Sequence, residues 1–157
     1  MWTIVNDFHI EKTRLPVVVV ATSGERLPGD LFVQANARNA SGYEDAYDVL
    51  NAAEPYFPLG TLSGRVLLCA KSHVRELLVP ASDGEPDGNA LGTRAEVVVA
   101  LSGGHLLKGT IVIELETARQ RVLDSFNRLS HRFLRLHTAE GLVLVNTDFI
   151  AYVEQEP

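Results

Sequence analysis

The sequence predicts a mainly β protein with short helices, made of two pseudo-symmetric β-β-α-β-β repeats that form small barrel-like or packed-sheet units. Three observations predict this fold class. Runs of β-branched residues end in Ser-Gly turns, blocks of the first half return in the second half, and a stretch rich in Gly, Pro and Asp separates the halves. With 46% hydrophobic and 22% charged residues, the 157-residue chain has the composition of a folded protein.

Five blocks of sequence occur twice in the same order. Together they share Gly, Asp and Asn as well as Val and Leu, which chance similarity between apolar runs does not explain. In the first and second copy they begin at Val18 and Val97, Gly29 and Gly109, Tyr47 and Leu123, Tyr56 and Phe133, and Gly64 and Gly141. One inserted residue separates the first two blocks of the second copy. Self-similarity of this kind indicates one small unit repeated in tandem.

The repeats set the domain boundaries. We expect an N-terminal arm or strand at 1–15, a first β-rich repeat at 16–79, a polar linker at 80–94 and a second repeat at 95–157. Gly, Pro, Asp and Ser dominate the linker, which therefore cannot bury enough surface to order itself. Units of about 60 residues bury a small fraction of their surface. The two copies are therefore expected to pack on each other or on a partner.

Each repeat opens with a predicted hairpin. Its strands lie at 17–22 and 29–34 in the first copy and at 96–101 and 109–115 in the second, joined by a Ser-Gly turn and a few polar residues. The second strand starts at Gly29 or Gly109, where a bulge or tight bend requires a backbone conformation that side chains resist.

A short helix follows in each copy, because the apolar residues of 44–50 and 121–126 recur at helical spacing. Asn51 and Asn127 come directly after, where a helix end often uses a left-handed residue. A second hairpin closes the unit. We expect its strands at 65–69 and 72–79 in the first copy, and at 142–146 and 149–154 in the second, the latter pair around a turn at 146–148.

Copy two carries the pattern V-x-V-x-L-S-x-G-x-x-x-x-G-x-I, then V-x-D-x-x-N, F-L-x-L and G-x-V-L-V-N between Val97 and Val153. In these motifs it resembles an uncharacterised family of short bacterial domains, which implies a tandem duplication but no activity. Copy one fits less closely, with Cys69 in place of Asn146 and a longer loop before its helix. The chain resembles Sm-like small barrels more distantly. Their helix comes first, and their basic, glycine-containing RNA-binding signature is missing here.

Charge and cysteine content limit the kinds of partner and the cellular compartment that the sequence favours. The net charge of −6 disfavours nucleic acid and anionic membranes as the main partner. A single cysteine, Cys69, excludes an intrachain disulfide and favours a reducing compartment. The segment 1–15 lacks the apolar core of a signal peptide, and the longest apolar run, 15–21, falls far short of the roughly 20 residues that span a bilayer. We therefore expect a cytoplasmic protein.

The sequence indicates no enzyme, no metal site and no cofactor. It contains no G-x-S-x-G, Walker-type or G-x-G-x-x-G motif, and its five histidines form no H-x-x-x-H pair. Cys69 falls on a predicted buried strand, where a small apolar role fits better than a nucleophilic one. The repeated Asp48 and Asp124 could pair across a pseudo-twofold axis, but bonding of each to nearby backbone explains their recurrence better.

Charge is the feature in which the two copies differ. The matching stretch of copy one is acidic, with Glu44, Asp45, Asp48 and Glu54. The candidate binding residues of copy two are Arg119, Arg121, Arg128, Arg132 and Arg135. The two regions are either separate solvated faces, or they meet within one chain or head to tail between chains. Alternatively, the arginines receive an acidic protein segment or a phosphate.

These observations favour a non-enzymatic protein-interaction or assembly module, a scaffold or adaptor that binds a protein partner or itself. The alternative is RNA or single-stranded nucleic-acid binding on a small-barrel scaffold, with Phe126 or Phe133 as a stacking surface beside the arginines. A second alternative is a sensor of an anionic small molecule, held between the repeats.

Overall fold

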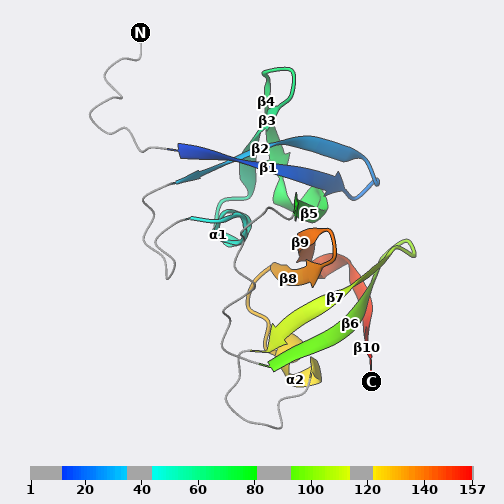
Figure 1. Ribbon diagram of the computed structural model, residues 1–157. Helices are drawn as coiled ribbons and strands as arrows, with labels where there is room; N and C mark the ends of the chain where they lie inside the picture. Colours follow the sequence, from blue (N-terminus) through cyan, green and yellow to red (C-terminus); the bar gives the residue numbers. More distant parts are fainter. Residues whose placement is uncertain (1–11, 35–43, 81–92, 114–121, 157) are drawn as a thin grey trace.

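The computed structural model describes residues 12–34, 44–80, 93–113 and 122–156, which form one antiparallel sheet of ten strands with two short helices (Figure 1). The first half contains β1 (Lys12–Ala21), β2 (Arg26–Gln34), α1 (Ala46–Asn51), β3 (Tyr56–Thr61), β4 (Val66–Ala70), the 3-10 turn η2 (Lys71–His73) and β5 (Val74–Pro80). The second contains β6 (Thr93–Leu101), β7 (Leu106–Ile113), α2 (Val122–Asn127), β8 (Phe133–Thr138), β9 (Gly141–Asn146), the 3-10 turn η3 (Thr147–Phe149) and β10 (Ile150–Gln155). The predicted mainly β fold with short helices is confirmed.

Each half contributes five neighbouring strands to the sheet, whose order is β10-β6-β7-β8-β9-β5-β1-β2-β3-β4. Within a half the order is the same: the last strand pairs with the first, followed by the second, third and fourth. The halves join where β5 lies antiparallel to β9 (Figure 1). Over the described residues the ladder stays open, with β4 and β10 at its two ends, and no closed barrel forms.

The predicted β-β-α-β-β unit lacks one strand in each copy. β3 and β8 were recognised as repeated blocks but not as strands, because Pro58 and Gly60 in β3 and the polar Arg135 and His137 in β8 interrupt the alternation of a strand. The observed unit is β-β-α-β-β-β with a 3-10 turn before the last strand.

Two expected boundaries also differ. β1 begins at Lys12, inside the segment 1–15 that was expected to be an arm or strand, and not at residue 17 as expected for the first hairpin, and it pairs with β2 over the whole of 12–20. The expected linker 80–94 overlaps the last residue of β5 and the first residues of β6. The remainder of both segments, 1–11 and 81–92, lies outside the described residues.

The strand pairing corrects the predicted alignment of the first hairpins. Val17 lies opposite Gly29 and Val97 opposite Gly109, so Val17 and not Val18 is the counterpart of Val97. The hairpins then align without the inserted residue that the block comparison required, because runs of identical valines carry no register of their own.

The same error affects β4, where the turn after β3 is one residue longer than its counterpart after β8. Pairing along β3 and β8 makes Ala70, opposite Tyr56, the counterpart of Asn146, opposite Phe133. Cys69 was therefore wrongly placed at the position of Asn146.

Gly29 and Gly109 are needed for close packing and not for a left-handed backbone. Neither is among the glycines with positive φ. A Cβ added at Gly29 would lie 2.5 Å from the carbonyl oxygen of Gly60, and one at Gly109 would lie 2.5 Å from that of His137. The predicted bend is thus replaced by a close approach of the neighbouring strand.

Two apolar cores lie along the sheet, and the first draws on both repeats. It contains residues from β1, β2, α1, β3 and β5, together with Phe133 of β8 and Leu144 of β9. The second core is built from repeat two, and among its partly buried members only Leu78 comes from repeat one. The expectation that the copies pack on each other is confirmed. Repeat two contributes fully buried side chains to the core of repeat one, but repeat one contributes none to the core of repeat two among the described residues.

Candidate functional site: the repeat junction and the free ends of the sheet

The junction between the repeats is a strand ladder backed by apolar side chains. β5 and β9 pair from Glu76 opposite Val145 to Pro80 opposite Gly141. In this ladder Leu77 lies opposite Leu144, and both side chains are fully buried. Backbone hydrogen bonds and apolar burial therefore hold the two repeats together along one line.

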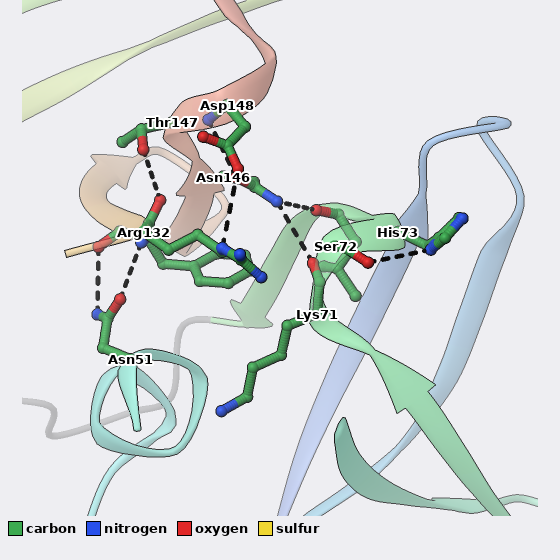
Figure 2. A network of polar contacts seen from close by, with 10 residues as sticks. Asn51, Lys71, Ser72, His73, Arg132, Asn146, Thr147 and Asp148 are labelled. Atoms are coloured by element: carbon green, nitrogen blue, oxygen red, sulfur yellow. Dashed lines mark hydrogen bonds and ion pairs between the residues drawn. The ribbon is translucent and has the colours of Figure 1, made fainter. Parts of the chain in front are cut away.

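Asn146 ties β9 to the 3-10 turn of the other repeat. Its fully buried carboxamide donates to the carbonyl oxygens of Lys71 at 3.3 Å and Val74 at 2.9 Å (Figure 2). Its Oδ1 accepts the backbone N–H of Asp148 at 3.0 Å. Both ends of the amide are thereby satisfied, as a buried polar group requires.

Asn51 forms the matching contact from the side of repeat one. Its Nδ2 donates to the carbonyl oxygen of Phe133 at 3.2 Å, and its Oδ1 accepts the N–H of Phe133 at 2.8 Å (Figure 2). The side-chain amide thus makes the two hydrogen bonds that the backbone of a neighbouring strand would make with Phe133. The predicted left-handed conformation at Asn51 and Asn127 is wrong, because no described residue other than glycine has positive φ.

Arg135 is the candidate arginine that meets the acidic region of copy one. Its guanidinium carbon lies 3.6 Å from the centre of the Tyr47 ring, and its Nη2 lies 3.3 Å from Oδ2 of Asp45. Asp45 also caps α1 by accepting the N–H of Asp48 at 2.9 Å. Burial raises the pKa of the Asp45 carboxyl, and Asp48 adds to the rise, while the N–H of Asp48 and the charge of Arg135 oppose it.

Of the other candidate arginines, Arg128 and Arg132 are described, and their surroundings differ from those of Arg135. Arg132 lies at the junction, with Nε 3.8 Å from Oδ2 of Asp148 in a largely exposed pair that contributes little stability. Arg128 is exposed just after α2. Arg119 and Arg121 lie outside the described residues.

A hollow of about 230 Å³ lies at the junction between residues 50–55, Lys71 and Arg132. Lys71 is buried there and donates from Nζ to the carbonyl oxygen of Ala52 at 2.9 Å. Burial lowers the pKa of Lys71 and Arg132 lowers it further, whereas Glu54 raises it. The hollow is smaller than the roughly 300–1,000 Å³ typical of small-molecule pockets.

Apolar side chains are exposed at the free ends of the sheet, in contrast to the junction. On β4, Val66, Leu67 and Leu68 are exposed, and Leu68 reaches 72%. Tyr152 on β10 is 62% exposed. β4 was expected to be buried, since a continuous apolar run is typical of a buried strand. The apolar run is present, but no described residue covers it.

Cys69 was expected on a buried strand, but it is half-buried on β4, the strand at one end of the sheet. Burial raises the pKa of its thiol. The described residues contain no group of three His, Cys, Asp or Glu side chains that could hold a metal ion. No helix among them is long and apolar enough to cross a membrane.

The aromatic residues proposed for base stacking are buried or partly buried. Phe133 is fully buried in the first core, and Phe126 packs partly buried against the second. The carboxylate of Asp48 accepts the N–H of Asp45 at 3.1 Å, which is the bonding to nearby backbone that was expected for it. No family model, curated protein or solved structure matches the chain.

Proposed function

We propose that the protein is a non-enzymatic assembly module that binds protein strands at the free ends of its sheet. The exposed apolar face of β4 carries this proposal. Natural proteins protect edge strands with charges, prolines or covering segments, because an unpaired edge is a template for another strand. β4 has the sequence Val-Leu-Leu-Cys-Ala, without a charge or a proline, and no segment among the described residues covers it.

An edge of this kind binds by strand addition. Backbone groups of β4 would form a ladder with an extended partner segment, and alternate side chains would enter the apolar surface beside it. The protein partner would thus be recognised by its β-forming apolar sequence. The junction within the chain supports the proposal, because β5 and β9 associate by the same contacts.

Exchange of Leu68 for Lys tests the proposal. We expect Leu68→Lys to abolish binding of protein partners, measured by co-purification from the native source and by light scattering, because a charge would be buried in the ladder. Leu62→Lys is the matched control, since Leu62 is 82% exposed in the adjoining turn but lies outside the strand. Equal partner binding by both variants and the wild type would refute it.

The observations support the alternatives less well. Nucleic-acid binding lacks an exposed aromatic platform at Phe133, and Arg135 is already paired with Asp45 and Tyr47. Sensing of an anion in the junction hollow has Lys71 and Arg132 in its favour, but the Lys71 ammonium is bonded to Ala52 and Glu54 offsets the positive charge.

A further inference from the structure

The two strands at the free ends of the sheet, β4 and β10, are the repeat counterparts of the two strands that join the repeats, β9 and β5. At the junction the last strand of repeat one, β5, pairs with the fourth strand of repeat two, β9. The ends of the sheet are the last strand of repeat two, β10, and the fourth strand of repeat one, β4 (Figure 1). Each copy of the chain therefore carries both halves of a second junction, at opposite ends.

We propose that β10 of one copy of this chain pairs antiparallel with β4 of the next copy, in the register of the internal β5·β9 junction. This inference rests on the proposed function and names its partner as a second copy of the chain. Head-to-tail contacts of this type are heterologous, so they generate rings or filaments.

The internal junction fixes the register of the proposed one. Val19 lies opposite Leu77 and Val99 opposite Val153, so Val153 is the counterpart of Leu77. Leu68, opposite Pro58, is the counterpart of Leu144, opposite Arg135. The buried pair Leu77 and Leu144 thus becomes Val153 against Leu68. The neighbouring pairs in this register are Tyr152 with Cys69, Glu154 with Leu67, Gln155 with Val66 and Glu156 with Arg65.

The side chains that enter a core across the junction have exposed counterparts. Phe133 and Leu144 of repeat two are fully buried in the core of repeat one. Their counterparts in repeat one are Tyr56, which is 58% exposed, and Leu68. The core of repeat two has no equivalent pair among the described residues. Tyr56 and Leu68 of the next chain would fill, in the core of repeat two, the positions that Phe133 and Leu144 fill in the core of repeat one.

The polar contact of Asn51 also has an unused counterpart. Asn127 ends α2 as Asn51 ends α1, and it is exposed with no hydrogen-bond partner recorded among the described residues. The backbone that Asn51 contacts belongs to Phe133, whose counterpart is Tyr56. In the assembly the carboxamide of Asn127 would therefore bind the N–H and carbonyl oxygen of Tyr56 in the next copy.

Two substitutions make the contact between copies weaker than the one within the chain. Ala70 stands where repeat two has Asn146, so the counterparts of the two bonds that Asn146 donates, to the 3-10 turn at Lys71 and to the start of β5 at Val74, are lost. Pro58 stands where repeat two has Arg135, so the contacts to Tyr47 and Asp45 are lost as well. The assembly is accordingly reversible and depends on concentration, whereas the internal junction is permanent.

A single new cysteine tests the register. Tyr152→Cys would lie opposite Cys69 of the next copy, at the Cα separation of paired antiparallel strands, which a disulfide spans. We expect mild oxidation to give a ladder of linked chains or a covalent ring. The two cysteines cannot join within one chain, because β4 and β10 are opposite ends of the sheet.

Two controls accompany this experiment. Gln155→Cys lies on the same strand but three residues out of register, and Tyr152→Cys combined with Cys69→Ser lacks the acceptor thiol; both are expected to stay unlinked. Light scattering of the uncrosslinked protein should show a mass that rises with concentration. Leu68→Lys should abolish this rise, Leu62→Lys should preserve it, and Ala70→Asn should lower the dissociation constant several-fold by restoring the missing amide.

The outcomes separate this inference from the proposed function. A wild type that remains monomeric at all concentrations, with no cross-linking of Tyr152→Cys, overturns self-assembly. If Leu68→Lys then still abolishes binding of a different protein, β4 binds a foreign strand and the proposed function stands. If it abolishes nothing, both fail.

Discussion

Asn51 and Asn127 occupy the same place in the two repeats but have different surroundings. Asn51 binds both backbone groups of Phe133, whereas Asn127 is exposed. The sequence shows two equal asparagines after two short helices, which suggests a shared local role at the helix end. Their difference depends on what each helix faces in space, and this is set by the order of strands in the sheet.

Alanine at each asparagine measures that difference. Asn51→Ala should lower the free energy of unfolding by about 1–3 kcal/mol, because it leaves the N–H and carbonyl oxygen of Phe133 without their partner. Asn127→Ala should change it by less than about 0.5 kcal/mol at concentrations where the protein is monomeric, as expected for an exposed position. Urea unfolding of both variants checks this. An equal decrease in the free energy of unfolding for both variants would show that the Asn51 contact with Phe133 does not stabilise the fold more than the exposed Asn127 does.

Single residues also show which parts of the site sequence reasoning could reach. The sequence shows an acidic region in repeat one and a basic region in repeat two. Contact between these two regions within one chain is one of the arrangements that it allows. Arg135, Tyr47 and Asp45 do meet there. Asn146 was read as part of a turn, because nothing local to an asparagine after an apolar run reveals that it binds carbonyl groups of Lys71 and Val74 in the other repeat.

At the scale of elements, α1 begins with a reciprocal cap. Asp45 accepts the N–H of Asp48, and Asp48 accepts the N–H of Asp45, which satisfies donors that a helix leaves unpaired at its start. The helix is only six residues long, so it depends on this cap and on the burial of Ala46 and Leu50.

Asp45→Asn separates the cap from the charge, because asparagine caps a helix as well as aspartate does. Burial raises the pKa of Asp45 above 3.8, so the folded protein keeps a proton that the unfolded chain has lost. The stability of the wild type relative to Asp45→Asn should therefore fall as pH rises from about 3.8 through the folded-state pKa. Unfolding free energies at several pH values test it. A relative stability that rises with pH would show that Arg135 outweighs burial.

The free strand β4 contains a natural reporter in Cys69. Because burial disfavours its thiolate, the reaction of Cys69 with an aromatic disulfide reagent should have its pH midpoint above 9.0 in the folded protein. The same chain unfolded in urea is the control and should react with the ordinary midpoint. Rates measured between pH 7 and 10 check the prediction, and a folded-state midpoint below 9.0 would contradict it.

Elements differed in how well the sequence predicted them. The hairpins of β1 with β2 and of β6 with β7 were predicted because β-branched runs and Ser-Gly turns act locally. β3 was missed because Pro58 and Gly60 interrupt it, although tertiary pairing with β4 accommodates both. Exposure of β4 could not be predicted, since an apolar strand at the end of a sheet has the same sequence pattern as one in the middle.

At the scale of the whole molecule, the two repeats form one sheet but not two equal cores. Phe133 and Leu144 of repeat two pack in the core of repeat one, whereas the only residue of repeat one that packs against the core of repeat two, among the described residues, is the partly buried Leu78. The duplication was evident from sequence, but the joining of β5 to β9 was not. Pairing between edges depends on which strands each repeat leaves free, and that follows from the strand order, which the missed β3 and β8 concealed.

Because a core is shared, the halves should unfold together. Leu50→Ala in repeat one and Ile111→Ala in repeat two each remove a buried side chain and should each cost about 2–5 kcal/mol. We expect both to lower the midpoint of one common transition, with coincident curves from near-UV and far-UV circular dichroism. Two separate transitions, each moved by only one of the variants, would mean that β5·β9 pairing and the shared Phe133 and Leu144 do not couple the repeats. Measurement of both variants at monomeric concentrations ensures that contacts between copies do not supply the coupling.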